Sequence, residues 1–171
     1  MKKFNLFFIA FILILSSCSS DDASLITSGD ILGTWKGTSL DYSGNTATNA
    51  QGQTINADFV GEAYDMNYTL TFKDDPKIVV SEGSYSLKLT TTVSGETMSQ
   101  NMENIAFLEA ESWSKNDNTL TVFNGDKSFD YTIVELTESL LKLSISTEED
   151  LSQQGINIIT TVNAIMTFSR D

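Results

Sequence analysis

After residue 30, apolar and polar residues alternate with a period of two along most of the chain. In the segment SYSLKLTTTV, Tyr85, Leu87 and Leu89 share one face, and serine, lysine and threonine occupy the other. The carboxyl-terminal segment INIITTVNAIMTFS repeats this pattern. Such alternation predicts half-buried β-strands, because a helix of 3.6 residues per turn would not produce it. The chain is therefore expected to be all-β.

Turn signals separate the predicted strands at short intervals. The segments DDPK, SGE, KNDN and NGDK contain the residues that tolerate the positive φ angles of tight hairpins. Hairpins without helical crossovers predict an antiparallel, up-and-down sheet. Closure into a β-barrel of 8 to 10 strands would remove the exposed sheet edges. The predicted strands are residues 34–42, 64–73, 77–80, 84–93, 97–104, 107–114, 119–123, 129–136, 140–146 and 156–169.

Residues 43–61, SGNTATNAQGQTINADFVG, interrupt the pattern with small polar residues. A connection of this length predicts a loop, which is either a lid over one mouth of the barrel or an insertion without a role. The stretch ends within the segment ADFVGEAYDM, which is compatible with a short helical turn.

The amino terminus has the composition of an export signal. Two lysines precede the apolar run LFFIAFILIL, and small residues lead to Cys18, the only cysteine. A membrane-spanning helix would need about 18 apolar residues, so a cleaved signal peptide is the better interpretation. The motif L-S-S-C resembles a bacterial lipobox. That resemblance implies removal of residues 1–17 and attachment of acyl chains, such as palmitate, to Cys18. The alternative is an incidental cysteine near an ordinary cleavage site.

The residues after Cys18 indicate where in the cell envelope the protein is located. Residues 18–30 are polar at their start and are expected to form a flexible tether, with the barrel domain over residues 31–171. Ser19 differs from the aspartate of an inner-membrane retention signal, and Asp21 and Asp22 resemble the export tethers of surface lipoproteins. We expect an exported lipoprotein that the acyl chains anchor to the outer membrane, with the cell surface as the further expectation.

Charge and residue inventory argue against several function classes. The formal net charge of −13 repels phosphates, so we expect no nucleic-acid partner. The chain has no histidine, so the usual proton shuttle is missing. The usual zinc ligands are missing too, because the one cysteine, Cys18, is expected to carry lipid. A glycosidase needs only two carboxylates, but the acidic pairs here are expected to be solvated. We expect a non-catalytic protein that holds no metal and no cofactor and that is a monomer.

Gly33-Thr34-Trp35 resembles the G-x-W signature of the lipocalins and lipocalin-like domains. The resemblance implies a lipocalin-like barrel over about residues 31–170, with the tryptophan at its closed end beneath an arginine that follows the last strand. Arg170, the only arginine, has that position. A guanidinium over an indole ring gains about 0.5 to 2 kcal/mol. Gly33, Trp35 and Arg170 are thus expected to close the barrel; alternatively, Arg170 is merely a terminal charge.

In such a barrel, inward side chains either fill the interior or leave room for a ligand. The leading hypothesis is a calyx that binds a small, mostly apolar molecule, in which tyrosine hydroxyls could orient a polar group. The alternative is a structural or interaction lipoprotein with a filled barrel that docks a protein or glycan. The candidate ligand-binding residues are Tyr68, Leu70, Tyr85, Leu87, Leu89, Leu120, Leu141, Leu143, Met166 and Phe168.

Overall fold

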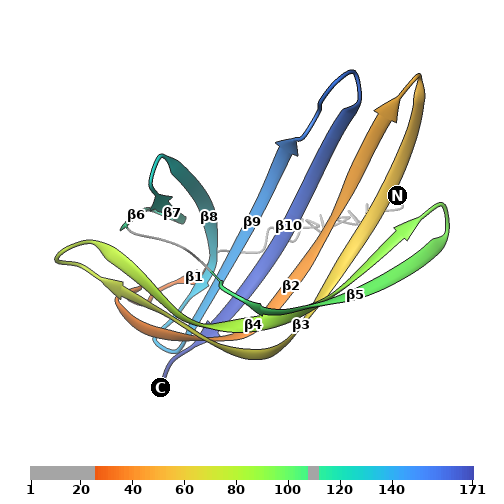
Figure 1. Ribbon diagram of the computed structural model, residues 1–171. Helices are drawn as coiled ribbons and strands as arrows, with labels where there is room; N and C mark the ends of the chain where they lie inside the picture. The colour runs from red at the N-terminus through yellow and green to blue at the C-terminus, as the bar shows by residue number, and fades with distance from the viewer. Residues whose placement is uncertain (1–25, 108–111) are drawn as a thin grey trace, which may run out of the picture.

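The computed structural model describes residues 26–107 and 112–171, and these residues form strands and turns without a helix (Figure 1). No described segment is therefore a helix that could cross a membrane. Cys18 and the predicted signal peptide lie outside the described residues. The strands are β1 (Ile26–Thr27), β2 (Gly33–Ala50), β3 (Gln53–Lys73), β4 (Ile78–Val93), β5 (Glu96–Ile105), β6 (Ser112–Asn116), β7 (Thr119–Asn124), β8 (Lys127–Leu136), β9 (Leu140–Asp150) and β10 (Asn157–Ser169).

The long strands form one antiparallel up-and-down sheet in the order β5-β4-β3-β2-β10-β9-β8-β7-β6. The short strand β1 adds a parallel pairing to β8. The first long strand, β2, thus pairs with the last strand, β10, as a meander that curls back on itself requires. Tight hairpins connect several of the strands; at the one between β4 and β5, Ser94 and Gly95 both have positive φ angles, 51° and 87°.

The predicted barrel closure is wrong, because the strands at the two edges, β5 and β6, do not pair with each other. A side chain partly spans this gap. The Trp113 indole on β6 donates a hydrogen bond to the Lys73 carbonyl at 3.0 Å. Its ring also packs edge-on against Phe72, with ring centroids 5.6 Å apart. The sheet therefore curls until β6 reaches the β3–β4 hairpin, but no backbone ladder joins its edges.

A bend divides the sheet into two halves. The pairing register shifts between Lys36 and Asp41 of β2 and between Tyr64 and Asn67 of β3. At the bend Gly83 has a φ of 85°, and a Cβ there would lie 1.9 Å from the Asn67 carbonyl oxygen. Figure 1 shows β2 and β3 crossing the base of the molecule and then turning upward beside β10 and β9. We call residues 41–62, 88–104 and 145–164 the projecting half, and the rest of the sheet the folded half.

The hydrophobic core lies mainly in the folded half, where side chains of β2, β3, β4 and β10 meet those of β6, β7, β8 and β9. It contains Trp35, Tyr68, Leu70, Phe72, Trp113, Leu120, Ile133, Leu141 and Phe168 among others. Burial of these large side chains supplies the main driving force for folding in a domain of this size. The interior of the folded half is thus occupied by side chains.

Residues 43–61 are not a loop, a lid or a helical turn. They form the outer parts of β2 and β3, which a two-residue turn at Gln51 and Gly52 connects. Cross-strand polar contacts support this hairpin: the Asn45 amide donates to Asp58 at 2.7 Å. The Thr46 hydroxyl lies 3.0 Å from that of Thr160 on β10. Small polar residues adopt strand geometry here because neighbouring strands pair with both sides of the hairpin.

Candidate functional site

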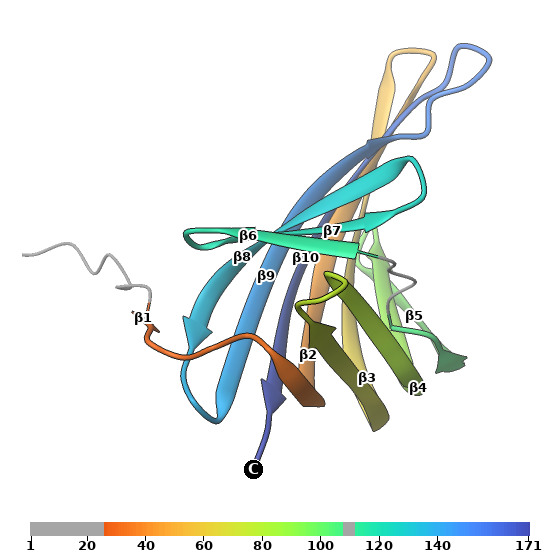
Figure 2. The same cartoon turned by 90° about the vertical axis from the view of Figure 1, so that its left-hand side faces the viewer.

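The projecting half has an apolar face that is only half covered. Side chains alternate along each strand, so the side that carries the core in the folded half continues into the projecting half. We call this side the inner face. Figure 2 shows that the hairpins which carry it end far from the carboxyl terminus. Its half-buried apolar side chains are Tyr42, Phe59, Leu89, Val93, Ile145, Ile158 and Val162.

Two aromatic rings form a platform on the inner face. The rings of Tyr42 and Phe59 stack with centroids 5.6 Å apart and an interplanar angle of 29°. Each ring lies over a glycine of the neighbouring strand: a Cβ on Gly44 would lie 2.3 Å from Phe59, and one on Gly61 would lie 3.0 Å from Tyr42. The rings therefore lie close to the sheet, which leaves an apolar surface above them.

A second aromatic cluster lies at the base of this face. Tyr68 is 1% exposed and stacks on Phe107, with ring centroids 4.5 Å apart. Phe168 packs edge-on against the Tyr68 ring, with ring centroids 5.9 Å apart. The centroid of the Tyr85 ring lies 5.8 Å from that of Tyr68. Among the described residues, the Tyr68 hydroxyl has no hydrogen-bond partner. A buried hydroxyl without a partner is costly, so this oxygen is a candidate contact for a ligand.

The tyrosine hydroxyls of the site stay protonated around neutral pH. Burial raises the pKa of Tyr68, and the neighbouring Tyr85 raises it further. Burial and then Tyr42 raise the pKa of Tyr85. Burial and then Glu149 raise the pKa of Tyr42. Tyr85 lies beside Tyr68 in the buried cluster, and strand register places Tyr42 and Glu149 on the inner face.

The predicted ligand-binding residues divide between the core and this site. Tyr68 and Tyr85 lie together in the aromatic cluster, and Leu89 lies on the inner face. The remaining candidates are buried in the folded half: Leu70, Leu87, Leu120, Leu141, Leu143, Met166 and Phe168. Sequence analysis missed Phe59 because it lies in the segment predicted to be a loop. It also missed the role of Phe107, whose contacts depend on the tertiary fold.

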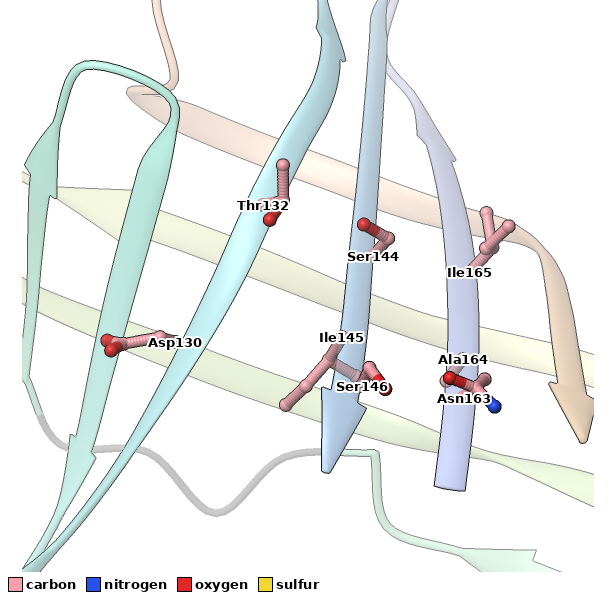
Figure 3. Close-up of a pocket in the computed structure, with 8 residues that line it drawn as sticks. All are labelled: Asp130, Thr132, Ser144, Ile145, Ser146, Asn163, Ala164 and Ile165. Carbon is pink, nitrogen blue, oxygen red and sulfur yellow. The ribbon is translucent and has the colours of Figure 1, made fainter. Parts of the chain in front are cut away.

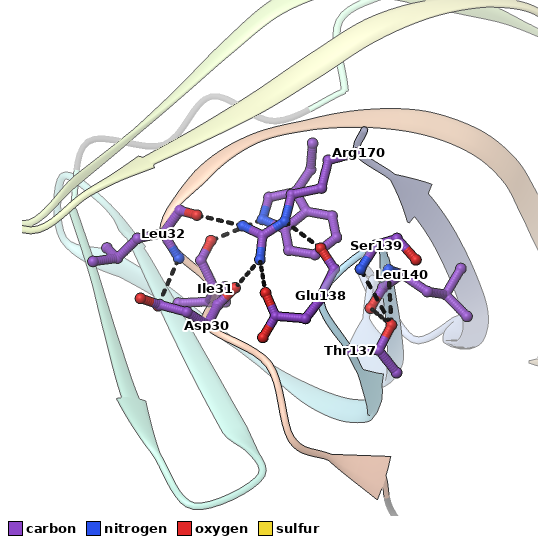
Figure 4. Close-up of polar contacts among 9 residues, drawn as sticks. Asp30, Ile31, Leu32, Thr137, Glu138, Ser139, Leu140 and Arg170 are labelled. Atoms are coloured by element: carbon purple, nitrogen blue, oxygen red, sulfur yellow. Dashed lines mark hydrogen bonds and ion pairs between the residues drawn. The ribbon is translucent and has the colours of Figure 1, made fainter.

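The residues predicted to close the barrel form a polar cluster at the opposite end (Figure 4). The guanidinium carbon of Arg170 lies 4.1 Å from the centroid of the Trp35 ring. Its nitrogens donate to the carbonyls of Glu138 at 2.7 Å, Leu32 at 2.5 Å and Asp30 at 2.9 Å. Gly33 lies beside them, and a Cβ there would be 3.5 Å from the guanidinium. Because β2 and β10 are neighbours in an open sheet, this cluster fastens one end of their seam and does not close a barrel.

A lateral opening lies where β8 and β9 separate. Their pairing ends at Thr132 and Ser144, and a cavity of about 400 Å³ lies at the fork (Figure 3). Asp130 and Asn163 line it from the outer face of the sheet, and Ala164 lines it from the inner face. In the described part of the chain, no group of three or more acidic or cysteine side chains is placed to hold a metal ion.

Comparison of this chain with protein-family models, with curated proteins and with solved structures finds no significant match.

Proposed function

We propose that this protein binds a small, mostly apolar molecule on the inner face of the projecting half. The observation that carries this proposal is the half-covered Tyr42–Phe59 platform, which continues directly from the core. Because side chains fill the folded half, the ligand would lie above the core and not inside a closed calyx. This arrangement is an open variant of the lipocalin-like binding mode that the G-x-W segment suggests.

We expect replacement of Phe59 by serine to weaken binding of the neutral dye Nile red about tenfold. This loss corresponds to about 1.4 kcal/mol and is within the range for a partly buried aromatic side chain. The measurement is a fluorescence titration of the purified protein. The matched control is Val60→Ser, because Val60 is adjacent in β3 but is 53% exposed and points to the outer face. Equal weakening in both variants would contradict the proposed site.

In a second candidate function, the protein has a filled core and docks another protein or a glycan. The exposed edge strand β5 favours it, since every residue from Glu96 to Asn104 is exposed. In that case, native mass spectrometry would find no small molecule that copurifies with the protein. Nile red would also fail to bind the wild-type protein.

We also propose that acyl chains on Cys18 anchor the protein to the outer membrane. Eight residue steps separate Cys18 from Ile26, so this connection spans at most about 28 Å. Residues 30–32 are in turn fastened to Arg170, at the end opposite the projecting hairpins. The anchored protein would therefore hold its folded half near the membrane and its inner face away from it. Several acyl chains would make this attachment durable.

Replacement of Cys18 by serine is expected to abolish incorporation of a clickable fatty acid and to release the protein from the membrane fraction. Metabolic labelling and cell fractionation measure the two effects. Ser19→Ala is the matched control and should retain both label and membrane attachment. A Cys18→Ser protein that stays in the membrane would refute the anchor.

A further inference from the structure

In the part of the chain that the structure describes, the Tyr68 hydroxyl is a donor without an acceptor. Its side chain is 1% exposed, and its oxygen has no partner among the described residues. A phenylalanine ring could occupy the same place without burying an unpaired hydroxyl. The hydroxyl therefore adds nothing to the packing, but it can serve a molecule that supplies an acceptor.

Packing fixes the position of this donor. The Tyr68 ring is stacked on Phe107 and meets the edge of Phe168. Its tip lies directly over the backbone of Gly37, where a Cβ would be 2.2 Å from the ring carbon that bears the hydroxyl. A donor held in this way loses little conformational entropy when it binds an acceptor, and this preorganisation favours affinity.

The surroundings of the hydroxyl select against an anionic ligand. The ring of Tyr85 lies 5.8 Å from that of Tyr68, and strand register places Tyr42 and Glu149 on the inner face. By strand register, none of the described lysines lies on the inner face of the projecting half; Lys88, for example, pairs with Glu62 on the outer face. A carboxylate there would have no cation to compensate it and would be repelled by Glu149.

We infer that the ligand is a neutral molecule with an apolar body and one hydrogen-bond acceptor, such as a carbonyl oxygen, and that Tyr68 donates to this acceptor. This inference rests on the proposed function, because it places the apolar body on the inner face. Tyr85 is half-buried, and its ring centroid lies 5.8 Å from that of Tyr68. The acceptor group of the ligand would reach the Tyr68 hydroxyl past this ring.

Three probes with ten carbon atoms each test this inference: octyl methyl ketone, decane and decanoate. Their affinities are measured by displacement of Nile red from the purified protein at neutral pH. We expect the ketone to bind about tenfold more tightly than decane, the range for one buried hydrogen bond. Tyr68→Phe should remove this advantage and leave the affinity for decane unchanged. Decanoate should bind more weakly than the ketone.

The matched control is Tyr131→Phe, because Tyr131 is also buried but lies on β8, and among the described residues its ring makes none of the aromatic contacts of Tyr68. It should leave the preference for the ketone intact. Thermal unfolding of Tyr68→Phe checks the fold, and we expect a melting temperature at least equal to that of the wild type. Equal affinities for ketone and decane, or tightest binding of decanoate, would overturn the inference while apolar binding stands. Failure of Nile red and of every probe to bind would refute the proposed function itself.

Discussion

Replacement of Arg170 by alanine is expected to lower the free energy of unfolding by about 3 kcal/mol. The guanidinium donates to the carbonyls of three residues from two separate segments and lies over the Trp35 ring. Its side chain is only 18% exposed, so water replaces these contacts poorly. Urea denaturation monitored by tryptophan fluorescence measures the effect. The ion pair with Glu138 adds little, because that carboxylate is 88% exposed.

Two further variants separate the geometry of Arg170 from its charge. Arg170→Lys keeps the charge but lacks the planar fork, so it should still lose about 2 kcal/mol. Lys142→Ala, on the outer face of the neighbouring strand β9, should change stability by less than about 0.5 kcal/mol. If Arg170→Ala unfolds at the wild-type urea concentration, the cluster does not stabilise the seam between β2 and β10.

Sequence patterning predicted the strands well where apolar residues alternate strictly. The carboxyl-terminal strand is an example: Met166 and Phe168 are buried, and Thr167 between them is not. Alternation predicted poorly where strand residues are small and polar. Residues 43–61 contain few apolar side chains, and they are strands because β10 and β4 supply pairing partners on both sides. Tertiary pairing overrides weak intrinsic preference here.

Alternation also could not decide whether the sheet closes. An open and a closed meander have the same inward and outward residues, and they differ only in the pairing of the last two edges. The edge strand β5 carries exposed residues on both sides, with Met98 69% exposed, so no buried face draws it toward β6. Trp113 instead reaches the β3–β4 hairpin. The alternation pattern does not reveal this contact, because it joins residues that are 40 positions apart in the sequence.

The candidate site was partly predictable. Period-two alternation placed Tyr68, Tyr85 and Leu89 on the inward side, where the structure has them. The platform could have been predicted only with the register of the β2–β3 hairpin, which sets Phe59 beside Tyr42, each ring over a glycine of the neighbouring strand. The lack of a partner for the Tyr68 hydroxyl among the described residues could not be predicted, because it depends on every neighbour that surrounds the oxygen.

Replacement of Gly37 by alanine is expected to lower the free energy of unfolding by about 2 to 3 kcal/mol. The new methyl group would lie 2.2 Å from the Tyr68 ring carbon that bears the hydroxyl and 2.6 Å from the two carbons beside it. The ring cannot move away freely, because Phe107 and Phe168 pack against it. Urea denaturation gives the stability. The same displacement should also reduce the preference for the ketone probe over decane.

A double-mutant cycle shows whether the Tyr68 ring is the cause. In a Tyr68→Ala background the methyl group of Gly37→Ala meets no ring, so its cost should fall by at least about 2 kcal/mol, although Tyr68→Ala is itself destabilising. An equal cost in both backgrounds would instead locate the strain in the β2 backbone. A positive coupling would mean that Gly37 fixes the Tyr68 donor by leaving space on β2 for the tip of its ring. The absence of a side chain at residue 37 would then be a requirement of the proposed binding site as well as of the fold.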